Sequence, residues 1–343
     1  MNASMWTRRV ILGLFLASLG ESFQVPTTIR SLKQLRPGHA LFASEDDSSS
    51  TASSTDFYVM VNGMPGPMAT AAAEACLRKG LKLAPFAMTG PDVEPATITV
   101  VDETTQKSSN VFLIPSTQTD EVAAKMEGFR EASSEANLLA IDYTHPSAVN
   151  SNAEFYVQQN LPFVMGTTGG DRDQLLQTVT DGKLSCVIAP NMGKQIVAMQ
   201  AALEDLASKY PAAFAGYTLD VVESHQKTKA DTSGTAKAVI DSITTLVGKD
   251  CTFQNPEDVT LIRDDQAAVE FGVPENALTG HAFHTYTLTS PDKSTQFALQ
   301  HNVAGRTIYA EGTADAVQFL AQQLQKDPRV YSMIDVLEAG ALE

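Results

Sequence analysis

One short stretch of the sequence, residues 223–236, gathers most of the side chains that could carry out acid–base chemistry on a small anion. It holds an imidazole, His225, and two ammonium groups, Lys227 and Lys229, and it ends in Ser233-Gly234-Thr235. The stretch follows a predicted strand, and Ser233 or Thr235 could cap the helix that begins there. Backbone N–H groups at a helix start bind carboxylate or phosphate, and a nearby imidazole or ammonium group can supply a proton. The stretch therefore predicts a site for an anionic substrate, and a solvated basic loop with a satisfied histidine is the alternative.

A glycine turn is the second element with recognisable chemistry. Gly63 to Ala69 reads G-x-x-G-x-x-A and lies between a predicted strand over 57–61 and a predicted helix over 69–79. Glycines in such a turn let backbone amides approach a pyrophosphate, whose negative charge the helix start stabilises. The spacing differs from G-x-G-x-x-G, so an ordinary strand–helix turn is the alternative. In this context the turn predicts dinucleotide binding.

The end of the next predicted strand, over 81–88, bears on which dinucleotide is used. It reads Ala87-Met88-Thr89-Gly90 and holds no Asp or Glu. An acid at this place would accept hydrogen bonds from the ribose 2′-hydroxyl of NADH and would repel the 2′-phosphate of NADPH. Its absence favours NADPH, and NADH stays usable because no Arg or Lys stands there either.

The elements that must position these residues alternate as in a Rossmann-like fold up to Pro190. The further strands are predicted over 96–101, 111–114, 138–142, 163–165 and 185–188, and the further helices over 120–132 and 150–159. After Pro190 the pattern changes to a long helix, scattered strands and a final helix. The long helix is predicted over 193–209 and the final helix over 312–325. The strands between them are predicted over 219–223, 284–288 and 296–301.

We therefore predict an α/β protein with two domains. An N-terminal Rossmann-like dinucleotide-binding domain is expected over 56–190, and the C-terminal segment 307–343 is expected to pack back on it. Residues 191–306 are expected to form a second α+β domain, built on a mostly antiparallel sheet, that binds substrate and mediates oligomerisation. The protein is expected to be a homo-oligomer.

The first 55 residues read as a targeting presequence and linker. Residues 1–44 carry a net charge of +4 and the rest of the chain −20, which marks a segment with a separate role. An apolar run over 10–19 is too short to span a bilayer and suits a signal peptide, and the acid-free segment 23–44 suits a transit peptide. Together they resemble the bipartite presequence of algae with complex plastids, with cleavage before Phe23. Delivery to the plastid stroma is therefore expected, and a plain secretory signal with a pro-segment is the alternative.

The overall composition argues against several other classes of protein. The formal net charge of −16 argues against nucleic acid as a partner. No later apolar run is long enough to cross a membrane, so the mature form is not expected to span one. Cys76, Cys186 and Cys251 are widely spaced, and neither a disulfide framework nor a metal site is predicted from them.

The stretch over 223–236 resembles the E-[AS]-H-x-x-x-K-x-D-x-S-G-T-A motif of the dihydrodipicolinate reductase family, and five other segments agree with that family in order. These are the nucleotide turn at 61–68, Asp142-Tyr143-Thr144, the plant-type run 163–173, Ala189-Pro190-Asn191-Met192, and the return from Gln300-His301 through Arg306 to Gly312. The resemblance covers about residues 57 to 335 and is closest to the plant-type branch. It implies NADPH- or NADH-dependent reduction of a dicarboxylate, dihydrodipicolinate, in the diaminopimelate route of lysine biosynthesis.

Positions in the family motifs imply roles for individual residues. His225 and Lys229 would be the catalytic pair, with Lys229 donating a proton and His225 orienting or polarising the substrate. The substrate-binding residues would be Gln226, Ser233, Gly234 and Thr235. The cofactor contacts would be Gly63, Pro65, Gly66, Pro67, Met68, Thr89, Gly166, Thr167, Thr168, Ala189, Pro190, Asn191 and Met192. Arg306 is a further candidate for a structural or cofactor contact.

Three positions depart from the family pattern. Gln226 stands where bacterial members have a second histidine, and its amide can hydrogen-bond a carboxylate but cannot titrate. Pro67 replaces a usual Lys or Arg and so removes a phosphate contact, and His145 replaces the Arg of some bacterial members.

Two other functions compete with this interpretation. Another two-domain imine or semialdehyde reductase is one, but a semialdehyde dehydrogenase would need a nucleophilic Cys, and Cys251 lacks a cationic or helix-start context. A non-catalytic nucleotide-sensing protein is the other, and it predicts the loss of His225 or Lys229, both of which are present.

Overall fold

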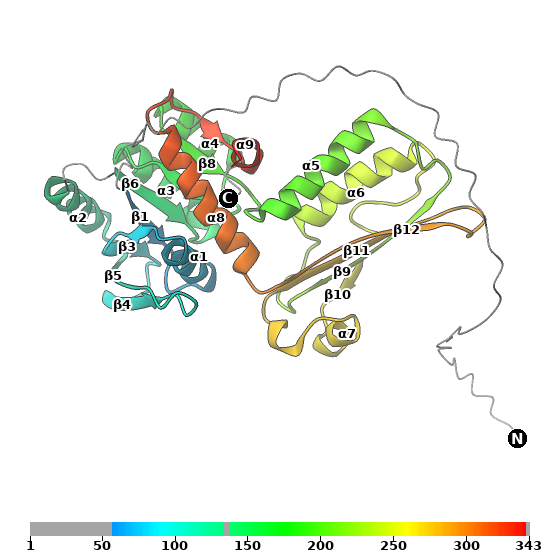
Figure 1. Ribbon diagram of the computed structural model, residues 1–343, viewed down its shortest axis with the longest axis horizontal. Coiled ribbons are helices and arrows are strands. Elements are labelled where there is room, and N and C mark those ends of the chain that lie inside the picture. Colours follow the sequence, from blue (N-terminus) through cyan, green and yellow to red (C-terminus); the bar gives the residue numbers. More distant parts are fainter. Residues whose placement is uncertain (1–56, 134–136, 341–343) are drawn as a thin grey trace, which may run out of the picture. The chain divides into compact units, whose positions relative to one another are not determined.

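A six-stranded parallel sheet organises the first half of the chain (Figure 1). The computed structural model describes residues 57–133 and 137–340, so the expected presequence lies outside the described residues. The strands in spatial order are β13 (Val330–Tyr331), β8 (Cys186–Ile188), β7 (Phe163–Met165), β6 (Asn137–Asp142), β1 (Phe57–Asn62) and β2 (Lys82–Leu83). The central strand β6 is apolar and buried along nearly its whole length, as expected of a parallel strand with helices on both faces.

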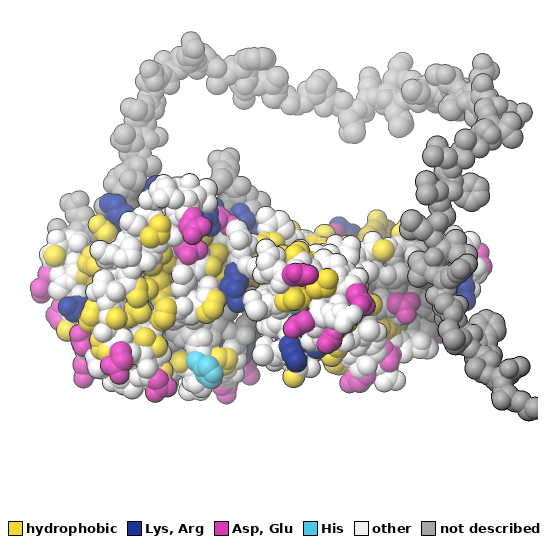
Figure 2. Space-filling model, turned by 90° about the horizontal axis from the view of Figure 1, so that it is seen from below, with side chains coloured by type: hydrophobic (Ala, Val, Ile, Leu, Met, Phe, Trp, Pro, Cys, Tyr) yellow, Lys and Arg dark blue, Asp and Glu magenta, His cyan; other side chains and the backbone are white. Residues whose placement is uncertain are grey.

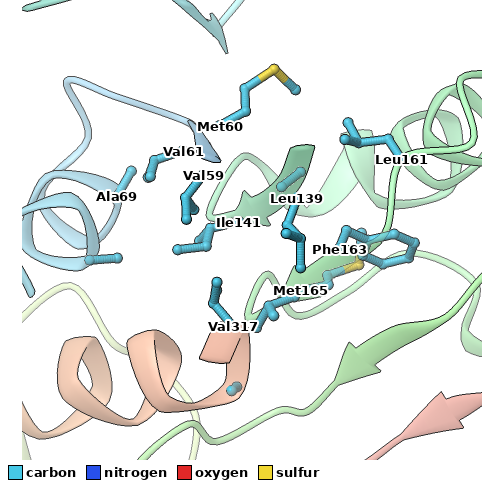
Figure 3. Close-up of a cluster of buried hydrophobic side chains, with 14 of the residues drawn as sticks. Val59, Met60, Val61, Ala69, Leu139, Ile141, Leu161, Phe163, Met165 and Val317 are labelled. Carbon is cyan, nitrogen blue, oxygen red and sulfur yellow. The ribbon is translucent and has the colours of Figure 1, made fainter. Parts of the chain in front are cut away.

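Helices from both ends of the chain cover this sheet. They are α1 (Pro67–Arg78), α3 (Val149–Gln158) with the short 3-10 turn η1 (Pro146–Ala148), α4 (Arg172–Asp181), α8 (Thr307–Gln323) and α9 (Met333–Glu338). The C-terminal helix α8 packs on α1, and Figure 3 shows its Val317 in the same apolar cluster as Val59 and Ile141 of the sheet. Helices α8 and α9 and strand β13 therefore complete the core of the first half.

The segment predicted as one strand over 81–88 is two strands in the structure. β2 pairs with β1, but Pro85 has no N–H to continue the ladder, and β3 (Phe86–Thr89) pairs instead with β5 (Ser108–Pro115). Together with β4 (Ala96–Val101), these strands form a separate three-stranded sheet against which α2 (Thr119–Ala132) packs. β3 stays tied to the main sheet, because the backbone N–H of Gly63 donates to Met88 O at 2.9 Å.

A four-stranded sheet forms the second half, and its order is β10 (Thr260–Ile262), β9 (Thr218–His225), β11 (His281–Thr289) and β12 (Gln296–Ala304). β9, β11 and β12 pair antiparallel, which confirms the predicted mostly antiparallel sheet, and β10 pairs parallel to β9. Helices α5 (Lys194–Lys209) and α6 (Gly234–Val247) lie side by side along it (Figure 1), and α6 shares an apolar core with β9 and β11. The short α7 (Asp265–Glu270) and the 3-10 turn η2 (Glu275–Ala277) follow β10.

The surface agrees with the acidic composition. Figure 2 shows Lys and Arg side chains dispersed among acidic ones on the face in view.

No helix among the described residues combines the length and the apolarity that a membrane span requires.

Helix α8, which was predicted over 312–325, begins earlier at Thr307, so Gly312 lies inside it rather than at its start. A Cβ at Gly312 would lie 1.7 Å from the carbonyl oxygen of Met192, so glycine is required for the close approach of α8 to the segment before α5. Nearby, the buried Asp315 of α8 pairs with Lys79 at 2.6 Å and with Lys194 at the start of α5. These contacts fix the segment that connects the two halves of the chain.

Replacing Gly312 with Ala should therefore destabilise the protein. The new methyl group would collide with backbone, and such overpacking costs about 1–3 kcal/mol of unfolding free energy. The control is Gly128→Ala on the exposed side of α2, where no atom lies within 4 Å of the added Cβ. That change should be neutral or stabilise by about 0.5–1 kcal/mol. Urea unfolding measures both, and equal stability of the two variants would contradict the proposed contact.

Candidate active site

A pocket of about 580 Å³ lies at the carboxyl ends of β1, β3 and β6. Residues of the glycine turn line it, together with Tyr143, Thr144 and His145 after β6. Six of the predicted cofactor contacts are in this lining, namely Gly63, Pro65, Gly66, Pro67, Met68 and Thr89. This is the edge of an open parallel sheet at which ligands bind.

The geometry of the glycine turn fits a phosphate. Gly63 has a φ of +101°, and a Cβ there would lie 2.0 Å from the Tyr143 carbonyl oxygen, so only glycine is accommodated. Gly66 precedes α1 and Pro67 opens it, and no side chain of the described residues caps this helix. The backbone N–H groups of its first turn therefore remain available to an anion.

Buried Asp142, the last residue of β6, holds the strand ends in place. It accepts hydrogen bonds from Thr167 Oγ1 and Tyr156 Oη, each at 2.6 Å, and from Asn152 Nδ2 at 2.9 Å. Burial, reinforced by the Asp142 carboxylate, raises the pKa of Tyr156 well above its ordinary value, so Tyr156 acts only as a neutral hydroxyl.

Thr167 and Gly166, which were predicted as cofactor contacts, do not line this pocket and instead contact other residues of the protein. The hydroxyl of Thr167 serves Asp142, and Gly166 lies against the Tyr143 ring, to which a Cβ would approach within 2.3 Å. Ala189 and Met192 are buried and are not part of the lining of this pocket either.

A second pocket, of about 570 Å³, collects the residues of the 223–236 stretch. Five residues predicted there line it, namely His225, Lys229, Ser233, Gly234 and Thr235. Thr168, Pro190 and Asn191, predicted as cofactor contacts, line this pocket too, so it joins the strand ends of the first half to the second half. Gln226 is not in the lining, and its carbonyl oxygen accepts the Lys229 N–H in a turn.

The buried carboxylate of Glu223 stands behind this pocket. Arg263 Nη2 donates to Oε1 at 2.5 Å, and the backbone N–H of Ser233 donates to Oε2 at 2.8 Å. His284 Nε2 lies 3.3 Å from Oε2. Burial by itself would raise the pKa of Glu223, but hydrogen bonds from these partners lower it to about 2. Glu223 is therefore an ionised group inside the protein.

Arg263 also fastens the loop that carries Lys229. Its Nε donates to Lys229 O at 2.7 Å, and its Nη2 donates to Asp231 O at 3.2 Å. One guanidinium thus links Glu223 of β9 to the backbone of the loop, which fixes where the Lys229 side chain begins.

The start of α6 presents the hydroxyl groups of Ser233 and Thr235 together with the backbone N–H groups of the first helical turn. Ser233 Oγ caps the helix by accepting the Ala236 N–H at 3.0 Å, which confirms Ser233 as the capping residue. Thr235 Oγ1 accepts from Asn191 Nδ2 at 3.0 Å, so this hydroxyl ties the start of α6 to the segment between β8 and α5 rather than capping the helix. The arrangement can hold a carboxylate at the helix start.

The titratable groups facing the pocket differ in character. Burial lowers the pKa of His225 to about 3, although the Glu223 carboxylate opposes this, so the imidazole is neutral near pH 7. Lys229 Nζ donates to Asp231 Oδ1 at 2.9 Å and is partly exposed. The pocket therefore holds the Lys229 side chain, with N–H groups to donate, beside a neutral imidazole.

Glu223, His225 and His284 present ligand atoms within 4.8 Å of one another, a spacing at which such groups can hold a metal ion. Both carboxylate oxygens, however, already accept hydrogen bonds from Arg263 and Ser233. A guanidinium at 2.5 Å balances the Glu223 charge that a metal would otherwise balance. The donor set therefore favours an ion-paired carboxylate.

Sequence reasoning did not assign Arg263 or His284 to the site. His284 falls in a predicted strand, and Arg263 lies forty positions from its partner Glu223. Neither belongs to a local motif. An alternation of His and aromatic residues along 281–286 was the available signal, but it predicts a sheet face rather than a specific contact.

Comparison with known protein families covers most of the chain. Residues 57–192 match the family model described as dihydrodipicolinate reductase, N-terminus, and residues 196–337 match dihydrodipicolinate reductase, C-terminus.

Among curated proteins, 4-hydroxy-tetrahydrodipicolinate reductase 1, chloroplastic, of Arabidopsis thaliana is 46% identical over 288 residues, which cover 82% of this chain and 78% of that protein. A probable 4-hydroxy-tetrahydrodipicolinate reductase 1, chloroplastic, of Oryza sativa subsp. japonica is 44% identical, with 83% and 79% covered. Among solved structures, dipicolinate-bound dihydrodipicolinate reductase from Paenisporosarcina sp. TG-14 superposes with a TM-score of 0.51 at 19% identity, covering 80% of this chain and 97% of that one. That likeness supports the fold.

Proposed function

The chain belongs to the dihydrodipicolinate reductase family, and we propose that it reduces 4-hydroxy-tetrahydrodipicolinate to tetrahydrodipicolinate with NAD(P)H, in the diaminopimelate route of lysine biosynthesis. One observation carries the proposal. The ammonium group of Lys229, the neutral imidazole of His225 and the start of α6 line a single pocket, together with Thr168 and Asn191 from the segments that follow β7 and β8. The coupled assay is direct: purified protein is mixed with dihydrodipicolinate synthase, pyruvate and aspartate semialdehyde. Loss of NADPH absorbance should depend on all components, and a rate no faster than without the protein would contradict the proposal.

The nucleotide pocket suits the cofactor. Its glycine turn and the uncapped start of α1 would hold a pyrophosphate through Gly63, Gly66 and Met68. A bound nicotinamide nucleotide supplies the hydride for reduction. We infer that Thr168 and the 189–192 segment frame the reactive end, because Thr168, Pro190 and Asn191 line the substrate pocket.

The remaining chemistry falls to residues of the second half. The α6 start, Ser233 to Thr235, would bind one substrate carboxylate, and Lys229 Nζ lies in the same pocket with protons to donate. Neutral His225 would orient or polarise the substrate, because its low pKa leaves no proton to transfer as an imidazolium near pH 7.

We also propose the division of labour within the chain. Residues 56–190 with 307–343 would bind the nucleotide, and residues 191–306 would bind substrate and mediate assembly of a homo-oligomer. β12 supports the assembly, since it is an edge strand of its sheet and its Phe297 is 50% exposed.

Lys229→Met should lower kcat by about 10²–10⁴-fold, the usual contribution of general acid catalysis, and should leave NADPH binding near normal. Lys227→Met is the matched control, because Lys227 is equally basic and two positions away but is exposed and outside the pocket lining. It should change kcat little. Steady-state kinetics measure kcat for both variants. An equal loss of kcat in the two would indicate a diffuse basic patch and would contradict a specific role for Lys229.

NADPH should be used at least as well as NADH. Apart from His145 and Tyr143, the lining of the nucleotide pocket holds no titratable side chain, so no carboxylate there repels a 2′-phosphate. The ratio of kcat/KM for the two cofactors measures this. A preference for NADH of tenfold or more, about 1.4 kcal/mol, would refute it.

We propose that residues 1–44 direct the protein to the plastid through a signal peptide followed by a transit peptide. Fused to a fluorescent reporter, they should deliver it to the stroma of an algal complex plastid. Phe23→Ala should stop the reporter short of the stroma. Stromal delivery by residues 23–44 alone would contradict the need for a signal peptide.

A further inference from the structure

The hydroxyl of Ser233 has two hydrogen-bond partners. The Ala236 N–H, at 3.0 Å, takes one lone pair, and His284 Nε2 lies 3.1 Å from the same oxygen. A serine hydroxyl offers two acceptor sites and one donated proton. If His284 donates, the Ser233 proton has to be accepted elsewhere.

Glu223 decides the direction of the His284 hydrogen bond. His284 Nε2 lies 3.3 Å from Glu223 Oε2 as well as near Ser233. An ionised carboxylate has no proton to give, so an unprotonated Nε2 would face it with a lone pair. On the other side of the ring, Nδ1 is buried without a hydrogen-bond partner among the described residues, so nothing there holds the proton. Nε2 therefore carries it and donates toward both oxygens.

With its lone pairs occupied, the Ser233 hydroxyl has a free proton beside the pocket. No other acceptor within the described part of the chain forms a hydrogen bond with Ser233 Oγ, and the residue lines the pocket beside Gly234 and Thr235. The Thr235 hydroxyl differs, because the one hydrogen bond it accepts among the described residues, from Asn191 Nδ2 at 3.0 Å, leaves its second lone pair open. Asn191 Oδ1 accepts the Gly193 N–H at 2.8 Å, which fixes that amide's orientation.

We propose that His284 is a positioning residue that, held by Glu223, keeps the Ser233 hydroxyl as a donor toward a carboxylate of the substrate. The proposal rests on the proposed function, since it names the ligand group that the α6 start would receive. His284 itself acts through Ser233. It thereby selects an acceptor such as a carboxylate over a donor such as an ammonium group.

Two substitutions separate this role from simple packing. His284→Leu removes the donor, whereas the amide nitrogen of His284→Gln can take the place of Nε2 and donate to the same oxygens. The leucine variant should weaken dipicolinate binding about tenfold or more, and KM should rise similarly, while kcat changes less than threefold. The glutamine variant should recover most of the affinity. Calorimetry with dipicolinate measures binding without turnover, and thermal unfolding reports whether each variant folds.

A double-mutant cycle tests whether His284 acts through Ser233. If it does, adding His284→Leu to Ser233→Ala should cost little further affinity, because the hydroxyl it orients is already absent. If the leucine variant does not fold, His284→Asn replaces it, since its shorter amide mimics Nδ1 and falls short of both oxygens.

Three results would overturn the proposal: unchanged dipicolinate affinity in the folded leucine or asparagine variant, equal loss in the glutamine variant, or fully additive losses in the cycle. A wild-type protein that binds dipicolinate but does not consume NADPH in the coupled assay would refute the proposed function alone. The binding measurements would still decide the role of His284.

Discussion

The second half of the chain, which carries the four-stranded sheet, is organised around one buried negative charge, the carboxylate of Glu223. Its side chain is fully inaccessible, and an unpaired charge there would be strongly unfavourable. Arg263 after β10, the Ser233 N–H before α6 and His284 of β11 all meet this one group. Satisfying it therefore fixes a strand end, a helix start and the loop with Lys229 in a single arrangement.

The nucleotide-binding half follows the same principle with a second buried carboxylate. Asp142 ends β6 as Glu223 nearly ends β9, and each gathers donors from segments far apart in the sequence. The two halves meet where Gly312 of α8 admits the Met192 carbonyl, and Asn191 then ties the segment after β8 to Thr235 at the start of α6. Each of the two pockets is thus built on the end of a strand.

The sequence predicted those parts of the fold and site that depend on local patterns. The glycine turn, the parallel strands and the stretch from Glu223 to Thr235 are contiguous, and the structure places five of the six residues predicted there for chemistry in one pocket. Gln226, the sixth residue, lies outside this pocket. It is part of a backbone turn in which its carbonyl oxygen accepts the Lys229 N–H. Arg263 and His284 escaped prediction because their contacts arise from strand pairing and register. Likewise, the sequence alone suggests that Gly312 marks a helix boundary, because its close contact with the Met192 carbonyl arises only in the folded chain.

The pH dependence of stability tests the ionised state of Glu223 most directly. Its pKa falls from an ordinary value of 4.5 to about 2 on folding, which corresponds to about 3 kcal/mol of stability. Because the folded-state pKa is depressed, this stability is present above pH 4.5 and is lost as the pH falls toward 2. The difference in unfolding free energy between wild type and Glu223→Gln should therefore be largest near pH 7 and shrink by more than 1 kcal/mol by about pH 3.5. A difference that does not change with pH would show that Glu223 is not held as a buried carboxylate, and the account of the site would fail.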